Sequence, residues 1–335
     1  MLVQEVRMFL YRRKVLLALL ANAPAALSLV QLQKIMFLFV QKSGNACYDF
    51  IPDTYGCYSM TLHDDIHNLE KNNFVMVTHG NDIFSTTVTI KKENYDDEEY
   101  LLTKEDGRAM RLVLESYPIN DVRKLIEMTY KLKPFYAIRS GIVKDCDDRE
   151  LEKSIVKCKE MIETGHPRCL YTIGYQGFSV DAFARTLMMY NIKTLVDVRK
   201  NAFSMRREFC GSPLMESLKE AGILYVAMPE VGIPSKDRKE MIPAGKLQEL
   251  FAWYKENVLP GCASYAKRIA DYVKQGSTAV MCYEELPKDC HRKLFAEYCL
   301  AKEPSIGQVR HIPRPGLMHE KKSSDNGAYL SPAID

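Results

Sequence analysis

The sequence of 335 residues has no long apolar run, no closely paired cysteines and no large excess of one charge. No segment reaches the roughly 18 apolar residues that a membrane-spanning helix needs, so we expect no contact with a membrane. Acidic and basic residues number 43 and 46, and this balance neither favours nor excludes a nucleic-acid partner. The ten cysteines show no CxxC spacing. We therefore predict a reducing, cytoplasmic location in which most thiols are unpaired.

An apolar stretch near the N-terminus follows Arg12, Arg13 and Lys14, an order that superficially resembles a signal peptide. Asn22 and Pro24 interrupt this stretch, and its continuation LVQLQKIMFLFVQK places apolar residues at helical spacing. We interpret the region as two amphipathic helices, over residues 3–20 and 28–41, rather than as a cleaved leader.

A third helix and a β-hairpin follow in the first half of the chain. The segment TLHDDIHNLEKNNF has apolar residues on one helical face, with Ser59 or Thr61 placed to cap its start. FVMVTHGNDIFSTTVTI is typical of two strands joined by a turn. Two more helices are expected, one from the Thr103-x-x-Asp106 cap and one through DVRKLIEMTYKL. Three helices followed by a hairpin predict a winged-helix-like domain over residues 1–145.

The second half of the chain alternates strands and helices. A charged segment, residues 146–167, is predicted to be a connecting helix. Residues 168–314 repeat an apolar strand followed by a helix, which is typical of a parallel sheet covered on both faces. The polar residues 315–335, rich in Pro and Gly, are predicted to be a disordered tail. The predicted fold class is therefore α/β, a Rossmann-like parallel sheet preceded by a winged-helix-like α+β domain.

Polar residues gather where the predicted parallel strands end. Ligands bind outside the carboxyl ends of such strands, because loops and helix N-termini converge there. Four strands end in such residues: Gly174 and Tyr175, Asp197 and Arg199, Glu230, and Cys282 and Glu284. Solvent at a strand end explains any one of them, but their coincidence in four strands predicts a site at this edge.

The segment MCYEELPKDCHR contains the densest group of reactive residues. It leaves a strand at Cys282 and opens the last helix at Cys290, His291 and Arg292. A helix N-terminus attracts anions, so together with Arg292 it is a candidate phosphate-binding site. The same position lowers the pKa of a thiol, which makes Cys290 a candidate nucleophile; the alternative is a buried, inert cysteine.

Metal binding is a second interpretation of Cys282, Cys290 and His291. A zinc site needs three or four nitrogen or sulfur ligands, and no further CxxC or HxxxH cluster supplies the remainder. We therefore expect no metal and no cofactor.

Two carboxylates and a basic loop complete the candidate site. Asp197 and Arg199 point the same way along their strand, so they form either a plain salt bridge or a functional carboxylate held by a cation. Glu284 is the natural second carboxylate. The loop SMRREF, which contains Ser204 and Arg206, follows the second strand and is placed to contact phosphate. Solvated loop charge is the alternative.

Residues 169–312 resemble the DUF488 family of uncharacterised bacterial proteins. The resemblance is carried by TIGY, LVDVR, LKEAGILYVAMPEVG and above all MCYEELPKDCHR. It implies a fold but little reaction chemistry. The positions that correspond to family motifs are Gly174, Tyr175, Asp197, Arg199, Glu284, Cys290, His291 and Arg292. Tyr175 stands where a histidine is often found, so the resemblance does not imply a base at this position.

Residues 28–73 resemble the helical domain of SocA-like (Panacea) antitoxins and phage-associated proteins, through LQKIMFLF and YGCYSMTLHDDIHNLEKNNFV. This resemblance implies a setting of conflict with phages. The third helix is acidic, unlike a helix that reads DNA bases. The basic surface is expected on Arg7, Arg12, Arg13, Lys14 and Lys34. The domain is therefore predicted to contact either DNA or a protein partner.

These observations predict an enzyme that acts on nucleic acid or a nucleotide. The leading hypothesis is a hydrolase, an N-glycosylase that removes a modified base from foreign DNA, with Asp197 or Glu284 as the carboxylate. Arg199, Arg292 and the start of the last helix would hold phosphate. One alternative is a ligand-sensing DNA-binding regulator or antitoxin-like module. Another is sulfur transfer by Cys290.

Overall fold

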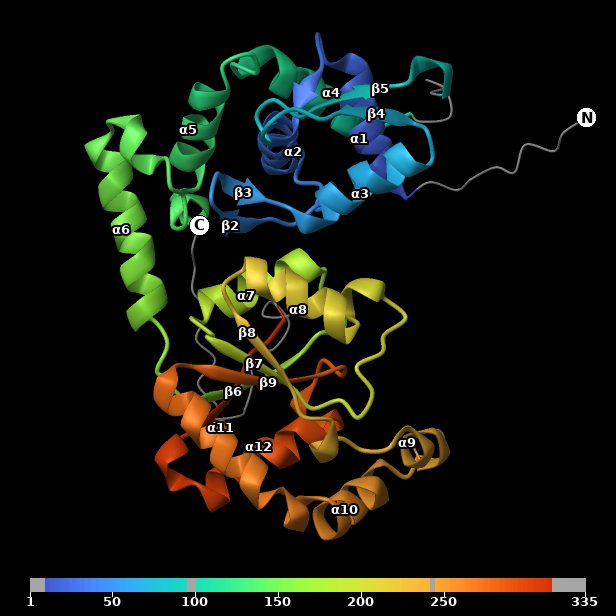
Figure 1. Cartoon of the computed structure of the whole chain (residues 1–335), viewed down its shortest axis with the longest axis vertical. Helices are drawn as coiled ribbons and strands as arrows, with labels where there is room; N and C mark the ends of the chain where they lie inside the picture. The colour runs from blue at the N-terminus through green and yellow to red at the C-terminus, as the bar shows by residue number, and fades with distance from the viewer. Residues whose placement is uncertain (1–9, 95–100, 242–244, 315–335) are drawn as a thin grey trace, which may run out of the picture. The chain divides into compact units, whose positions relative to one another are not determined.

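The computed structural model describes residues 10–94, 101–241 and 245–314, and the chain divides into two compact units, Met1–Lys159 and Glu160–Asp335 (Figure 1). The predicted tail and the basic residue Arg7 lie outside the described residues. Among the helices described, none is long and apolar enough to cross a membrane. Each unit has an apolar core of its own.

Helices and short antiparallel strands build the first unit. The helices are α1 (Tyr11–Asn22), α2 (Leu29–Ser43), α3 (Met60–Lys71), α4 (Lys104–Ser116) and α5 (Val122–Leu132), with α6 (Arg149–Thr164) at the unit boundary. The strands are β1 (Leu27–Ser28), β2 (Ile51–Asp53), β3 (Gly56–Tyr58), β4 (Val75–Thr78) and β5 (Thr87–Ile90). One sheet has the order β1-β5-β4, and β2 pairs with β3. The predicted helices and hairpin are present, although the first helix, predicted over residues 3–20, begins at Tyr11, and residues 3–9 lie outside the described residues. The winged-helix interpretation stays a prediction.

Capping side chains determine where two of these helices begin. Ser28 accepts a hydrogen bond from the N–H of Gln31, and the Gln31 side chain accepts one from the N–H of Ser28. Ser59, rather than Thr61, caps α3 by accepting from the N–H of Leu62. Such caps satisfy amide groups that have no partner within the helix. The local sequence therefore specifies the starts of α2 and α3.

The basic surface predicted for this unit is partly wrong. Lys34 is 2% exposed and donates to the carbonyl oxygen of Cys57 at 2.7 Å, so it belongs to the core. Arg12 and Arg13 of α1 donate to the carboxylate of Asp65 on α3, at 2.5 and 2.7 Å. Asp65 is 1% exposed, and a buried carboxylate is costly without cations to balance it. These two arginines therefore connect α1 to α3.

The second unit is a parallel α/β sheet with the strand order β10-β6-β9-β7-β8. The strands are β6 (Leu170–Gly174), β7 (Thr194–Asp197), β8 (Leu224–Ala227), β9 (Thr278–Cys282) and β10 (Val309–His311). The helices are α7 (Val180–Met189), α8 (Gly211–Glu220), α9 (Ser235–Met241), α10 (Leu247–Asn257), α11 (Ala263–Gln275) and α12 (His291–Lys302). The prediction of a Rossmann-like parallel sheet with flanking helices is confirmed.

Helices cover both faces of this sheet, with α7 and α8 on one face and α11 and α12 on the other (Figure 1). Successive residues of a strand point to opposite faces. Val196, Val198 and Cys282 belong to the apolar core formed with α10, α11 and α12. Asp197 and Arg199 alternate with Val198, so their side chains lie on the α7 and α8 face. This alternation decides which polar side chains meet at the end of the sheet.

Candidate functional site

A buried ion pair lies at the end of β7. Nε of Arg199 lies 2.9 Å from Oδ1 of Asp197, and Nη2 lies 2.6 Å from Oδ2. The two residues are 4% and 1% exposed. The hydroxyl of Tyr225 on β8 donates to Oδ2 at 2.6 Å, and burial together with the Asp197 charge raises the pKa of Tyr225. Both carboxylate oxygens are therefore held in place, and the prediction that Asp197 and Arg199 point the same way is confirmed.

Tyr175 extends this group toward β6. Its hydroxyl accepts a hydrogen bond from Nη1 of Arg199 at 3.0 Å. Its ring stacks on Phe209, with centroids 4.5 Å apart and planes 12° from parallel. Its N–H donates to the carbonyl oxygen of Cys282 at 3.1 Å. Tyr175 is only 3% exposed, so it positions Arg199 and offers no free face to a ligand.

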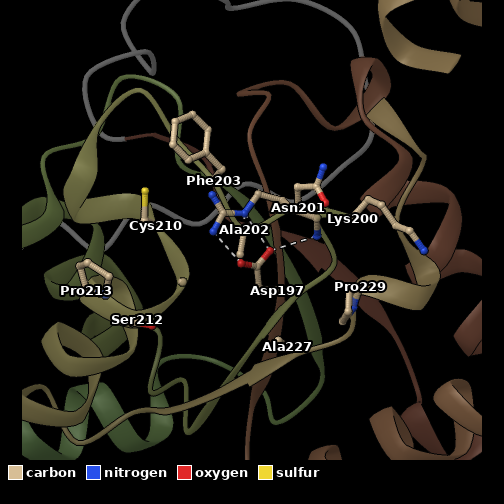
Figure 2. A pocket seen from close by; sticks show the side chains of 12 residues that line it. Asp197, Lys200, Asn201, Ala202, Phe203, Cys210, Ser212, Pro213, Ala227 and Pro229 are labelled. Atoms are coloured by element: carbon tan, nitrogen blue, oxygen red, sulfur yellow. Dashed lines mark hydrogen bonds and ion pairs between the residues drawn. The ribbon is translucent and has the colours of Figure 1, made fainter. Parts of the chain in front are cut away.

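An open pocket of about 540 Å³ lies beside the ion pair, between the ends of β7 and β8 and the start of α8 (Figure 2). Its walls include Asp197, Arg199, Lys200, Phe203, Cys210 and Ser212. Phe203 is 75% exposed, and Lys200 is exposed as well. Pockets of this volume are typical of small-molecule sites. The pocket offers a ligand the exposed cation of Lys200, the exposed ring of Phe203 and the N-terminus of a helix, and the buried pair of Asp197 and Arg199 forms part of its wall.

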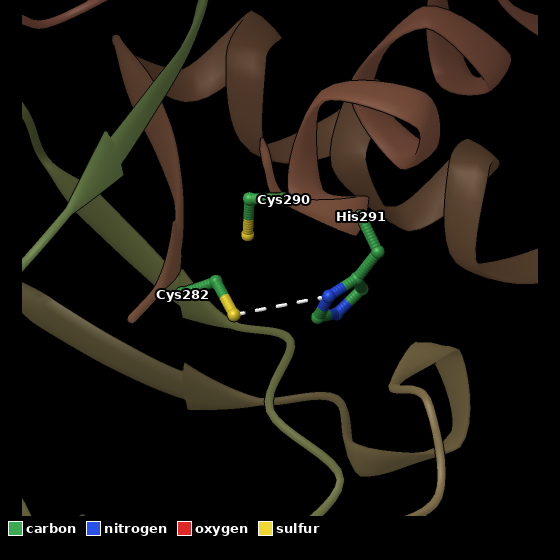
Figure 3. A group of neighbouring side chains, drawn as sticks. All are labelled: Cys282, Cys290 and His291. Atoms are coloured by element: carbon green, nitrogen blue, oxygen red, sulfur yellow. Dashed lines mark hydrogen bonds between the residues drawn. The ribbon is translucent and has the colours of Figure 1, made fainter. Parts of the chain in front are cut away.

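A second group of reactive side chains lies where β9 ends and α12 begins (Figure 3). Sγ of Cys282 lies 3.8 Å from Nδ1 of His291 and 3.5 Å from Oε2 of Glu284. The sulfur of Cys290 points into the same space, and the donor atoms of Cys282, Cys290 and His291 all lie within 4.8 Å of one another. These three residues are 4% exposed or less, so the group is closed to solvent.

Mutual contacts shift the pKa values of this group. Burial opposes a thiolate at Cys290, but hydrogen bonds with Cys282 and His291 and the charges of His291 and Arg292 hold its pKa well below the usual value. The contact with Cys290, together with burial, raises the pKa of Cys282 well above the usual value. Burial and the Cys290 charge raise the pKa of Glu284 to about 7. Burial opposes a charged His291, but its contact with Cys290 raises its pKa.

Arg292 and Gly174 were both predicted to bind substrate. In the structure they pack against the segment that connects β9 to α12. Arg292 is fully buried, and its guanidinium donates to the carbonyl oxygens of Glu284 and Glu285, the latter at 2.9 Å. A Cβ atom on Gly174 would lie 1.8 Å from the carbonyl oxygen of Glu284, so only glycine allows this close approach. Both residues thus fix the course of the chain after β9.

The predicted basic loop is internally bonded. Arg206 forms an ion pair with Glu208 at 2.7 Å and donates to the carbonyl oxygen of Phe178. Oγ of Ser204 accepts from the N–H of Arg206 at 3.2 Å. The guanidinium of Arg206 also lies 4.8 Å from the centre of the Phe209 ring. These contacts order the loop that leads from β7 to α8.

The predicted site residues therefore share one edge of the sheet but form two groups on its opposite faces. Asp197 and Arg199 lie on the pocket side, and Cys282 lies on the α12 side. Main-chain atoms link the two groups: Nε2 of His291 lies 3.1 Å from the carbonyl oxygen of Val198, just after β7, and the N–H of Tyr175 donates to the carbonyl oxygen of Cys282. The expectation of one shared pocket is thus replaced by two neighbouring sites.

Two contributors to the pocket side, Tyr225 and Phe209, were not predicted. In the register of the sheet Ala227 is paired with Asp197, so Tyr225, two residues earlier, lies on the same face as Asp197. The alternation of side chains along LYVA indicates that Tyr225 and Ala227 share a face. Placing Tyr225 beside Asp197 also requires knowing that β7 pairs with β8. Phe209 lies in the connection before α8, where no periodic pattern indicates which side chains are buried.

Comparison with known proteins finds one matching family model for part of the second unit. Residues 179–299 match the family model described as a domain of unknown function, DUF488. No curated protein matches the chain. The matched range contains the ends of β7, β8 and β9 and the start of α12, and hence most of both groups of side chains. The resemblance of the first unit to SocA-like domains stays a prediction. The DUF488 model therefore matches the part of the chain whose sequence motifs carry the predicted resemblance.

Proposed function

We propose that the second unit binds a nucleotide, free or within a nucleic-acid strand, in the pocket beside Asp197 and hydrolyses it. One observation carries this proposal: Arg199, Lys200, the exposed ring of Phe203 and the Asp197 carboxylate line a single space. Cations and the N–H groups at the start of α8 suit a phosphate. An exposed aromatic ring suits a stacked base. This combination favours a ligand that has both a phosphate and a base.

The reaction that we propose is cleavage of an N-glycosidic bond. The bond between C1′ of the sugar and the base nitrogen breaks, and a water oxygen forms the new bond to C1′. The base leaves with the electron pair and takes up the proton that the water loses. Positive charge develops at the sugar in the transition state, and a nearby carboxylate stabilises it. Asp197 suits this role because Arg199 and Tyr225 hold both of its oxygens in place.

A modified base in foreign DNA is the substrate class that we favour, which gives the protein a role in antiviral defence with DNA as its partner. An enzyme that works on a base must take it out of the duplex, and a pocket for one nucleotide with an aromatic wall fits an extruded base. Glu284, the other carboxylate considered, does not line this pocket. Asp197 is therefore the carboxylate that we assign.

Product analysis tests this proposal. The full-length protein is incubated with ordinary DNA, modified phage DNA and free nucleotides, and released bases are measured by mass spectrometry. Asp197→Asn should abolish base release. Phe203→Ala should weaken nucleotide binding by roughly 5- to 150-fold, because a stacked base contributes about 1–3 kcal/mol. Met205→Ala is the matched control, since Met205 is 95% exposed and is not among the residues that line the pocket.

The outcomes separate this proposal from its alternatives. Base release by Asp197→Asn at the wild-type rate would contradict the role of the carboxylate. Nucleotide binding without any product would favour a ligand-sensing regulator, which uses the same pocket. Sulfur transfer is the least favoured alternative, because Cys290 is not among the residues that line the pocket.

A further inference from the structure

We propose that Cys282, Glu284, Cys290 and His291 bind a zinc ion at the junction of β9 and α12. This site lies on the sheet face opposite the pocket and does not depend on the reaction proposed there. From the sequence alone zinc was not expected, because no second CxxC or HxxxH cluster supplies the remaining ligands. In the structure one short segment, residues 282–291, supplies two sulfurs, one ring nitrogen and one carboxylate. That set meets the usual requirement for four ligands.

The separations of the donor atoms fit a tetrahedral ion. Zinc–sulfur and zinc–nitrogen bonds of about 2.3 and 2.0–2.1 Å place neighbouring ligand atoms about 3.5–3.8 Å apart. Sγ of Cys282 lies 3.8 Å from Nδ1 of His291 and 3.5 Å from Oε2 of Glu284. The Cys290 sulfur is within 4.8 Å of the other two cluster atoms and points into the same space (Figure 3). Small side-chain rotations therefore suffice to close the site.

The orientation of His291 is already that of a metal ligand. Its Nε2 lies 3.1 Å from the carbonyl oxygen of Val198. A carbonyl oxygen only accepts, so Nε2 must carry the proton, and the lone pair of a neutral ring is then on Nδ1. That nitrogen faces the sulfur of Cys282. A backbone carbonyl that fixes the second ring nitrogen is a recurrent feature of histidine ligands.

The buried charge of Arg292 also favours an anionic group beside it. Arg292 is fully buried, and its described hydrogen bonds go to two main-chain carbonyl oxygens. No ion pair of Arg292 occurs within the described parts of the chain, and its Nε has no hydrogen-bond partner there. A buried cation without a counter-charge is costly. Two thiolates and a carboxylate around Zn²⁺ leave one net negative charge beside Arg292, which balances it.

Four protein ligands, of which Cys282, Cys290 and His291 are 4% exposed or less, indicate a structural ion that ties the end of β9 to the start of α12. The full-length protein is purified without added metal or chelator, and its metal content is measured by elemental mass spectrometry. The metal-free protein is then titrated with Co²⁺ alone, which gives a sulfur-to-cobalt charge-transfer band when thiolates bind. Wild type should hold about one zinc per chain and develop the band. Cys282→Ser and Cys290→Ser should lose both.

Cys299→Ser is the matched control, because Cys299 is equally buried on α12 but lies outside the cluster. It should keep the zinc and the cobalt band. Should the ligand variants fail to fold, the wild type alone still decides, since a chelator should lower its thermal midpoint and added Zn²⁺ should restore it. The proposal is overturned if wild type shows neither zinc nor the band, or if the ligand variants retain them. A Cys282–Cys290 disulfide in the freshly purified, metal-free protein would overturn it too.

Discussion

Loss of either partner from the buried pair of Asp197 and Arg199 is expected to destabilise the second unit strongly. Arg199→Met leaves the Asp197 carboxylate, 1% exposed, with Tyr225 as its remaining described side-chain donor. Asp197→Asn leaves the Arg199 guanidinium, 4% exposed, with the hydroxyl of Tyr175 and a neutral amide. Breaking a buried pair in this way costs about 3–5 kcal/mol of unfolding free energy, because an unbalanced charge remains inside the protein.

The double variant should lose less than the sum of the two single losses, because it leaves no unbalanced charge. The expected coupling free energy is about 2 kcal/mol, within the usual range for residues in direct contact. Urea unfolding followed by tryptophan fluorescence measures all four proteins. The chain has one tryptophan, Trp253, which lies partly buried on α10, so the signal reports the second unit.

Glu208→Gln provides the control for an exposed pair. Arg206 and Glu208 form an ion pair at 2.7 Å, but their side chains are 43% and 34% exposed. Solvent screening limits such a pair to about 1 kcal/mol or less. Additive losses for Arg199→Met and Asp197→Asn, or a loss as small as that of Glu208→Gln, would refute the inference that burial makes the first pair a strong interaction.

Three further predictions concern packing, pH and the first unit. Gly174→Ala should markedly reduce the urea midpoint, because its Cβ would overlap the carbonyl oxygen of Glu284. Gly261→Ala should leave the midpoint unchanged, because a Cβ at this position would have no atom within 4 Å. Equal midpoints for the two variants would contradict this prediction. Burial of the ring, followed by the charges of Arg292 and Lys293, lowers the pKa of His311 to about 4. Wild-type stability should therefore fall from pH 6.5 toward pH 4, because in this range His311 binds a proton in the unfolded chain but not in the folded one. Because the ring is partly exposed, this loss should be about 1–2 kcal/mol and absent in His311→Gln, and identical pH profiles would exclude it. Asp65→Ala should lower the thermal midpoint of the first unit, because Arg12 and Arg13 then lose the carboxylate that they share. Circular dichroism measures the midpoint, and an unchanged value would show that these contacts do not stabilise the unit.

The fold was largely predictable because it depends on local signals that the sequence carries directly. Ser28 and Ser59 each lie where a side-chain oxygen can satisfy the first amides of a helix, and each does so. Three strands of the second unit, β6, β7 and β9, are buried on both faces, and their continuous apolar runs predicted a parallel sheet. The burial of Lys34 was not predictable, because the carbonyl oxygen of Cys57 that receives its ammonium comes from another element.

The location of the site at one edge of the sheet was predictable, but its division into two groups on opposite faces was not. Alternation along a strand placed Asp197 and Arg199 on one face. It gave no information on the loop after β9, where the buried guanidinium of Arg292 and the glycine at position 174 direct the chain toward α12. Cys290 and His291 therefore lie against Cys282, on the other face. The placement of Cys290 and His291 on the face opposite Asp197 depends on tertiary packing, which spacing in the sequence does not encode.

Asp197, which ends β7, and the next two residues join the two sites. The side chains of Asp197 and Arg199 line the pocket, whereas the carbonyl oxygen of Val198 between them holds the ring of His291. A change in the position of His291 should therefore move the wall of the pocket. If both proposals hold, removal of zinc should weaken nucleotide binding about 5-fold or more, and nucleotide should strengthen zinc binding by the same factor, because coupling between two sites is reciprocal. Equal nucleotide affinities in the zinc-loaded and metal-free proteins, measured by calorimetry, would show that this segment does not transmit the change.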